Sequence, residues 1–244
     1  MRLIEYVDRV YIIHLPERTD RYKALKGELR NIGIDIHHPK VQFPKPPYPT
    51  EANGFPSLGV YSNFIRHLGI LKECLKDGIE RVWVLEDDAI FRHQLRDEKE
   101  QQKLIQRLRQ DDWDLCFLGH KIEPEILRTF PPGLVRFSGG FTHMHCYCVN
   151  AQVLPKLVHY FEETLINPPG HPRGGRLYID AAFNMFRELH PEVTALVSNP
   201  NLSTQKGCLS NIASRHWYDR YSMINPLTAT ARSLRDEAWR YQWI

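Results

Sequence analysis

The stretch Val82-Trp83-Val84-Leu85-Glu86-Asp87-Asp88-Ala89 carries the clearest structural signal in this chain. Its first four residues are β-branched, aromatic or bulky and apolar, which is typical of a buried strand. Three adjacent carboxylates then end the apolar run. Anions at a recessed strand end repel one another and lose hydration, so the cluster is costly unless a divalent cation or basic side chains lie among them. The alternative is a solvated acidic turn, because Asp is common in turns.

The composition is that of an ordinary soluble globular protein. The chain has 244 residues, 42% hydrophobic and 25% charged, which is enough for one large domain with a substantial core. A net charge of +3 is too small to argue for nucleic acid, although it permits an anionic ligand or peripheral contact with an anionic membrane surface. No segment approaches the roughly 20 apolar residues that span a bilayer, and the charged start is not a signal peptide. Five scattered cysteines indicate free thiols in a reducing compartment. We therefore expect a cytoplasmic protein, at most peripheral at the membrane.

Hydrophobic patterning predicts strands that alternate with helices. The expected strands are 10–15, 82–85, 113–119, 133–137, 144–149 and 193–197, and 34–43 could hold another. The expected helices are 22–32, 60–75, 97–109, 151–163 and 179–189, with a further helical stretch from 231, and the Pro-rich segment 40–56 is expected to be a mobile loop. This alternation favours an α/β fold with a mostly parallel central sheet flanked by helices. We expect a single domain over 1–244, with a core of about 8–212 and a C-terminal tail of 213–244.

Three segments follow one another in an order found in a known family. The first is Tyr11-Ile12-Ile13-His14-Leu15 with an Arg-rich turn after it, the second is 59–68, and the third is 84–91. They resemble the motifs of glycosyltransferase family 25, which includes bacterial lipopolysaccharide sugar transferases and collagen galactosyltransferases. The third motif matches almost letter for letter, whereas His14 stands where Asn is usual and Arg66 replaces a Ser. Weaker matches follow in the family's order at 115–119, 147–149, Asp180 and the pair Gln205 and Ser210.

The resemblance implies a GT-A-like nucleotide-sugar-binding fold, an Asp-x-Asp kind of carboxylate motif that holds Mn²⁺ or Mg²⁺, and inversion at the anomeric carbon. It also implies a nucleoside-diphosphate donor, most simply a UDP-hexose, and an acceptor hydroxyl on a glycan, glycolipid or protein, as in lipopolysaccharide biosynthesis. In α/β sheets ligands bind beyond the carboxyl ends of the strands, which is where the carboxylate triplet is expected to lie.

Within the triplet, Asp88 is the first choice for a direct metal ligand, because hard oxygen donors suit Mg²⁺ and Mn²⁺. Glu86 precedes it by two residues, faces the same way in an extended backbone, and could share the metal or bind the ribose of the donor. Asp87 faces the other side and is expected to support the donor site as a structural group.

The acceptor hydroxyl must lose a proton to a carboxylate or His base. Asp180 is the candidate base, since it follows a Gly/Pro-rich loop and opens a helix. The alternative role for Asp180 is capping of that helix. His67 and Asp114 are lesser candidates, and His67 is better explained as a packed histidine.

The remaining donor contacts are assigned to His14, Arg18, Gln205 and Ser210. Arginine suits bidentate phosphate contact, and the motif match favours Arg18 for the donor site. Arg21 is interpreted instead as part of a solvated first helical turn with Asp20 as its partner. Gln205 and Ser210 are placed in a C-terminal loop that closes over the diphosphate, with the neighbouring Lys206 interpreted as a surface residue.

The sequence also contains residues that suit other chemistries. The run His143-Met144-His145-Cys146-Tyr147-Cys148 contains zinc-ligand types, but in a strand its His and Cys residues face opposite ways, so core thiols are expected. A catalytically silent sugar-nucleotide-binding protein of the same fold is the main alternative function. A phosphatase-like hydrolase ranks last, because no nucleophile with a matching Lys and Ser/Thr set is evident.

Overall fold

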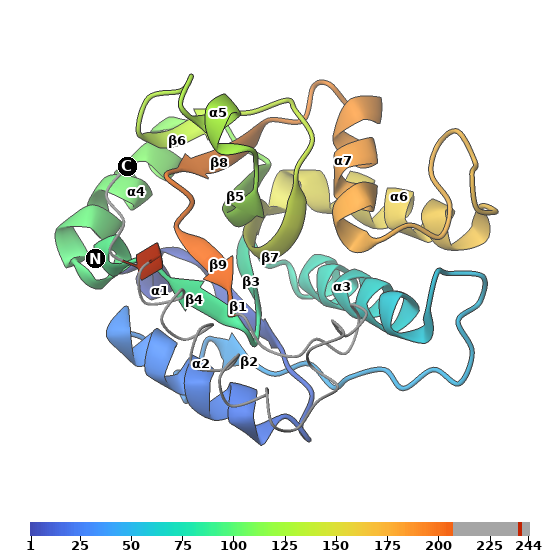
Figure 1. The fold of residues 1–244 in the computed structure, drawn as a ribbon, viewed down its shortest axis with the longest axis horizontal. Helices are drawn as coiled ribbons and strands as arrows, with labels where there is room; N and C mark the ends of the chain where they lie inside the picture. The colour runs from blue at the N-terminus through green and yellow to red at the C-terminus, as the bar shows by residue number, and fades with distance from the viewer. Residues whose placement is uncertain (207–238, 241–244) are drawn as a thin grey trace, which may run out of the picture.

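The fold is built on one mixed sheet (Figure 1). The computed structural model describes residues 1–206 together with Trp239 and Arg240. Its nine strands are β1 (Arg9–Ile13), β2 (Val41–Gln42), β3 (Arg81–Glu86), β4 (Ala89–Phe91), β5 (Leu115–Lys121), β6 (Gly133–Arg136), β7 (Thr142–Asn150), β8 (Ala195–Asn199) and β9 (Ser203–Gln205). They follow the order β2-β1-β3-β7-β5-β8-β6, and β4 and β9 pair beside this path.

Six of these nine described strands run in one direction, which confirms the α/β class with a mostly parallel sheet. Strand β7 is the main exception, because it lies antiparallel between β3 and β5. Its reversed direction has a consequence for the site. The beginning of β7 lies at the same edge of the sheet as the carboxyl ends of β1, β3 and β5.

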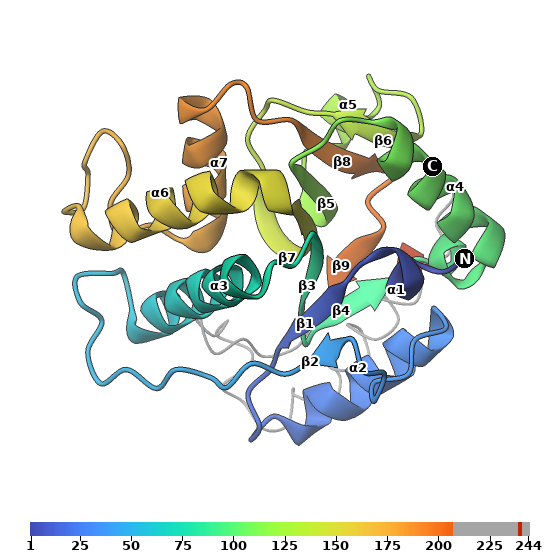
Figure 2. The same ribbon diagram turned by 180° about the vertical axis from the view of Figure 1, so that it is seen from behind.

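Helices cover both faces of the sheet (Figures 1 and 2). They are α1 (Leu3–Tyr6), α2 (Thr19–Asn31), α3 (Leu58–Asp77), α4 (Glu98–Gln110), α5 (Pro124–Leu127), α6 (Leu154–Ile166) and α7 (Ile179–Leu189), with 3-10 turns at His93–Arg96 and Ala151–Val153. One hydrophobic cluster joins α3, α6 and α7 to the sheet, and a second joins α1, α2 and α4 to its other face.

Strand β3 shows why the sheet needs a helical layer on each side. Val82 and Val84 belong to the cluster with α3, whereas Trp83 and Leu85 belong to the cluster with α2. All four side chains are fully buried, so the alternation of the strand serves two cores at once. Burial of a side chain of this size is worth roughly 1.5–3 kcal/mol, which fixes the register of β3 and hence the place where its carboxylates emerge.

The ends of the two helices nearest the site follow from local sequence. Ser57 caps α3 by accepting a hydrogen bond from the N–H of Val60, and Gly78 ends the helix in the left-handed region with φ of 66°. Gly33 follows α2 with φ of 78°, as the sequence predicts. These residues set where α2 ends and where α3 begins and ends.

Several boundaries differ from those predicted. Within 34–43 only Val41–Gln42 forms a strand, and the rest of the Pro-rich segment is a loop. The sequence analysis did not identify β4, β9, α1 or α5, which are too short for a periodic signal. The predicted tail of 213–244, including the helical stretch from 231, lies outside the described residues apart from Trp239 and Arg240. The expected single-domain organisation stays a prediction.

Two further expectations concern the thiols and the membrane. Cys74, Cys116, Cys146 and Cys148 are free, as predicted, and all four are buried, while Cys208 lies outside the described residues. Burial raises the pKa of the Cys74 thiol to about 12, so this thiol stays protonated and inert at neutral pH. Among the described helices, none combines the length and apolar character needed to cross a bilayer.

Candidate active site

A cavity of about 750 Å³ opens at the carboxyl ends of β1 and β3. Its size is in the range of small-molecule sites. Its walls come from segments far apart in the chain: the β1–α2 turn, the first half of α3, the acidic turn after β3, the beginning of β7, the beginning of α7 and the end of β9. The polar residues that line it include Arg18, Arg21, Asn63, Arg66, Glu86, Asp87, Asp88, His143, Tyr178, Asp180 and Gln205.

Two carboxylates in this cavity carry charge that the fold does not fully neutralise. Burial, followed by the charge of Asp87, raises the pKa of Glu86 to about 7. Burial, followed by the charge of Glu86, raises the pKa of Asp88 to about 7. Arg21 opposes both shifts but does not cancel them. This is the electrostatic cost that the sequence predicts for three recessed carboxylates, so the triplet is not a solvated turn.

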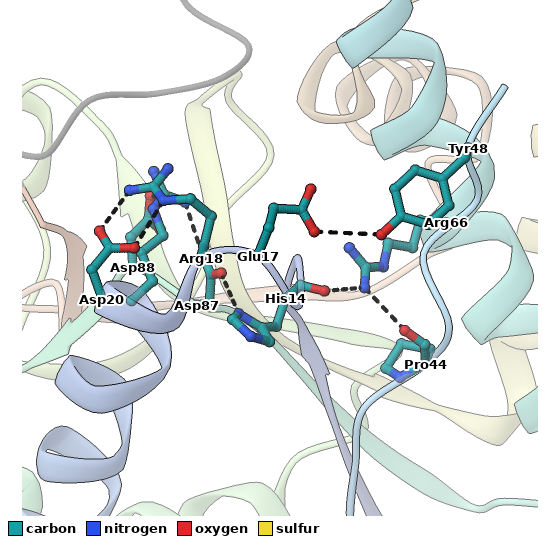
Figure 3. A network of polar contacts seen from close by, with 10 residues as sticks. His14, Glu17, Arg18, Asp20, Pro44, Tyr48, Arg66, Asp87 and Asp88 are labelled. Carbon is teal, nitrogen blue, oxygen red and sulfur yellow. Dashed lines mark hydrogen bonds and ion pairs between the residues drawn. The ribbon is translucent and has the colours of Figure 1, made fainter. Parts of the chain in front are cut away.

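The third carboxylate is held by the protein. Asp87 is 5% exposed, and its two oxygens accept hydrogen bonds of 2.8 Å from Arg21 and from the Nδ1–H of His14. The register explains this contact, because Ile13 lies opposite Glu86 in the parallel β1–β3 pair and the next residues are neighbours. Figure 3 shows His14 reaching Asp87 from the end of β1. Asp87 lines the same cavity as Glu86 and Asp88 and shares Arg21 with Asp88, so the expectation that it faces the other side is wrong. Direct donor contacts of Asp87 and His14 stay predictions.

The two arginines of the β1–α2 turn both line the cavity, and a donor contact of Arg18 stays a prediction. Arg18 forms hydrogen bonds of 2.9 and 3.0 Å to Asp20, which lowers the pKa of that acid to about 2. Arg21 forms ion pairs with Asp87 at 2.8 Å and Asp88 at 3.2 Å. The expectation of a solvated Arg21 paired with Asp20 is therefore wrong. The cause is the starting point of α2. Because the helix begins at Thr19, its first turn directs the side chain of Arg21 inward, whereas Arg18 stays in non-helical backbone.

The carboxylate oxygens of the acidic turn fit a site for a divalent cation. Asp88 Oδ2 contacts Arg21, whereas its Oδ1 is buried and has no hydrogen-bond partner among the described residues. Such an oxygen is costly unless a cation or donor reaches it. In the described part of the chain, no three His, Cys, Asp or Glu side chains are grouped to hold a metal alone. A metal bound here would need further ligands, such as the substrate phosphates that Mg²⁺ commonly takes.

Asp180 enters the cavity from the first turn of α7. The N-cap position is Tyr178, and Asp180 Oδ1 accepts the N–H of Ala181 in the first helical turn at 2.9 Å, so the helix-end role weighed for Asp180 stays open. Its Oδ2 accepts a hydrogen bond of 3.3 Å from the N–H of His143 at the beginning of β7. The antiparallel direction of β7 therefore positions the candidate base. Its catalytic role stays a prediction.

Gln205 reaches the site through the pairing of β4 with β9, in which Ala89 lies opposite Gln205. Its Nε2 donates a hydrogen bond of 2.9 Å to Glu86 Oε2. The next residue, Lys206, donates its N–H to the carbonyl oxygen of Asp88 at 2.7 Å. Gln205 thus contacts the acidic turn directly, and Ser210 lies outside the described residues.

The two lesser candidates for the base are poorly placed. His67 is fully buried and hydrogen-bonded to the hydroxyl of Tyr147 at 2.7 Å, and burial lowers its pKa to about 3. It is the packed histidine that the sequence favours. Asp114 lies before β5, at the edge of the sheet opposite the cavity, where it accepts the N–H of Thr194.

The His/Cys run of β7 does not converge on one point. Cys146 and Cys148 are buried in the core cluster with α2, as predicted, and the indole N–H of Trp83 contacts the Cys146 sulfur at 3.3 Å. His145 donates from Nδ1 to the carbonyl of His143, while His143 itself is exposed.

Sequence reasoning missed part of this cavity. The motif pattern marks Arg66 only as a departure, and the sequence assigns no role to Asn63 or Tyr178. Spacing on α3 was an available signal, because Gly59, Asn63 and Arg66 recur at helical intervals of four and three residues and share one face.

Comparisons with known proteins add little at the level of residues. No protein-family model matches the chain, and no curated protein matches it. It is similar to a solved structure described as a glycosyltransferase involved in the glycosylation of the major capsid of PBCV-1. The two are 11% identical with a TM-score of 0.46, over 94% of this chain and 97% of that chain. This likeness is too distant to assign a role to any residue, so membership of family 25 stays a prediction.

Proposed function

We propose that this protein is a metal-dependent glycosyltransferase that moves a sugar from a nucleoside-diphosphate donor, most simply a UDP-sugar, to an acceptor hydroxyl. The observation that carries the proposal is the pair Glu86 and Asp88, whose pKa values both rise to about 7 in a cavity of about 750 Å³. Recessed carboxylates with an excess of negative charge suit a cation that also binds phosphate. The motif resemblance and the mixed α/β sheet, which suits a GT-A-like fold, support the same conclusion.

Asp88 and Glu86 would hold the metal, Mn²⁺ or Mg²⁺. When bound, the ion supplies Lewis-acid stabilisation to the leaving diphosphate. Arg21 already occupies one oxygen of Asp88 and both neutralises and orients the carboxylate. His14 and Arg21 together fix Asp87, which keeps the acidic turn in one arrangement.

Asp180 would act as the base in a transfer with inversion. The acceptor oxygen attacks the anomeric carbon, its proton passes to Asp180, and the bond from that carbon to the diphosphate breaks on the opposite face. Asp180 comes from a different wall of the cavity than Glu86 and Asp88, as this arrangement requires. An acceptor on a glycan, glycolipid or protein would enter from the α7 side, and a cytoplasmic or membrane-peripheral location accords with such a substrate.

The contact of Arg21 with Asp88 favours one alternative: a sugar-nucleotide-binding protein without transfer activity. A guanidinium at this carboxylate could replace the metal, since its charge already meets part of the electrostatic need. The two functions differ in their response to metal. A binding protein of this kind would take up the donor equally well with Mn²⁺ or with EDTA.

The decisive experiment measures release of nucleoside diphosphate from a panel of UDP-, GDP- and ADP-sugars, with acceptor screens, in Mn²⁺, Mg²⁺ and EDTA. Turnover that requires metal supports the proposal. Donor binding without turnover and without metal dependence favours the binding protein. Absence of both turnover and binding for every donor would refute the two proposals together.

A further inference from the structure

Arg66 is a buried cation in the wall of the cavity. It projects from α3, is 7% exposed and lines the same space as Glu86 and Asp180. One terminal nitrogen, Nη2, donates hydrogen bonds to the carbonyl oxygens of His14 and Pro44. Figure 3 shows the guanidinium between these two carbonyls, beside the β1–α2 turn.

Unlike the other arginines of the cavity, Arg66 forms no ion pair with a carboxylate of the described residues. Arg18 pairs with Asp20, and Arg21 pairs with Asp87 and Asp88. The Nε–H of Arg66 is buried and lacks an acceptor in the described part of the chain. Burial lowers the pKa of Arg66, with the charges of Asp87, Tyr48 and Glu17 acting the other way. Buried charges are normally paired, so a guanidinium bound only to neutral carbonyls has capacity for an anion.

The helix that carries Arg66 adds to this field. Ser57, Gly59 and Val60 bring the N-terminus of α3 to the same cavity. The first N–H groups of a helix have no intrahelical acceptor, and the macrodipole places positive potential there. In a helix of 20 residues this end attracts oxyanions. Gly59, Asn63 and Arg66 lie along one helical face, so the guanidinium and the helix N-terminus border the same space.

We propose that Arg66 and the first turn of α3 form an oxyanion subsite that binds a phosphate of the donor's diphosphate. This inference rests on the proposed function and deepens it. The carboxylates of the acidic turn repel a diphosphate, and a metal neutralises only that side of it. A second cation that lines the same cavity stabilises the charge that develops on the leaving diphosphate, and Arg66 is the arginine there that forms no ion pair with a described carboxylate.

The test compares probes with and without phosphate. Affinities for UDP, uridine and inorganic pyrophosphate are measured by calorimetry in saturating Mn²⁺ and again in EDTA. Arg66→Gln removes the charge but keeps an amide that can donate to a carbonyl. It should weaken UDP and pyrophosphate by at least about tenfold and uridine by less than about twofold. Arg66→Lys, which keeps the charge, should recover part of the loss.

A matched control tests whether Arg66 binds an anion or only holds the Pro-rich segment in place through its hydrogen bond to Pro44. The hydroxyl of Tyr48 ties that segment to Glu17 at 3.4 Å, and Tyr48 does not line the cavity. Tyr48→Phe should therefore leave the affinity for UDP within about twofold of wild type. Equal loss of UDP and uridine affinity in Arg66→Gln would show that Arg66 acts only as a clamp and would overturn the proposal.

Remaining outcomes are also decisive. Unchanged UDP affinity in Arg66→Gln overturns the subsite. If that variant instead weakens UDP-glucuronate relative to UDP-glucose, the oxyanion is a sugar carboxylate and the phosphate assignment is wrong. Should Arg66→Gln not fold, Arg66→Met, which also removes the charge, decides by the same comparison of UDP with uridine. Phosphate binding that depends on Arg66 without any sugar transfer would refute the proposed function and leave the subsite intact.

Discussion

Gln205 donates a hydrogen bond of 2.9 Å to Glu86, although 119 residues separate them in the chain. The bond depends on the short pairing of β4 with β9, which brings the end of β9 beside the acidic turn. It is one of the interactions that oppose the raised pKa of Glu86.

Removal of this bond should change the ionisation of Glu86. We expect Gln205→Met to raise the pKa of Glu86 further and to lower the transfer rate about tenfold near neutral pH, because a hydrogen bond to a charged group is worth roughly 1.5–3 kcal/mol. The acidic limb of the pH–rate profile should move to higher pH. Thr204→Val, on the same strand, serves as the control, and an identical profile in both variants would contradict the assignment.

Asp88→Asn should abolish transfer and at the same time stabilise the protein without metal. An acid whose pKa rises on folding binds more protons in the folded state, so stability is lost as pH increases from about 4 to about 7. The variant lacks this penalty. Relative to wild type, its free energy of unfolding should rise by about 3 kcal/mol between pH 4.5 and pH 8. Urea unfolding in EDTA measures this, with the exposed Asp112→Asn as control.

Mn²⁺ should bind more tightly as pH rises through 7. The metal requires both carboxylates to be ionised, and each has a pKa of about 7, so binding releases protons. The increase in melting temperature caused by Mn²⁺ should be larger at pH 8 than at pH 6 and should vanish in Asp88→Asn. A shift of equal size at both pH values would argue against metal at these carboxylates.

Asp180→Asn should remove transfer while UDP affinity stays near that of wild type. Asparagine keeps the hydrogen bond that the N–H of His143 donates to this position, but it cannot accept a proton. We expect a fall in rate of at least about a hundredfold, in line with the usual contribution of a general base. Glu188→Gln, exposed on the same helix, should retain activity. A variant at Asp180 that keeps more than about a tenth of wild-type turnover would exclude it as the base.

His145 should contribute to acid sensitivity. Burial lowers its pKa to about 4, so the unfolded state binds the proton first and stability is lost as pH falls from about 6.5 towards 4. At pH 5 this loss is worth about 2 kcal/mol for a shift of that size. The destabilisation caused by His145→Gln should therefore shrink by about that amount between pH 7 and pH 5. A difference between the two proteins that does not change with pH would contradict the buried neutral state.

The sequence by itself determined the local parts of this protein. Strand β3 and its acidic end follow from an apolar run that stops in three carboxylates, because burial favours the run and hydration favours the charges. The ends of α2 and α3 follow from local residues. Gly33 and Gly78 adopt the positive φ at which each helix stops, and Ser57 accepts a hydrogen bond from a free N–H at the start of α3. The α/β class follows from the alternation of such elements.

Only the tertiary structure decided which charges meet. Arg18 and Arg21 are three residues apart and chemically alike, and the starting point of α2 assigns Arg21 to the acidic turn. The reversed direction of β7 brings His143 to Asp180, and the β4–β9 pairing brings Gln205 to Glu86. These contacts join residues far apart in the chain, and their energy depends on helix rotation and strand order, which local patterns do not encode. The same holds for Arg66, whose charge became informative only once its surroundings were known to be neutral carbonyls and an open cavity.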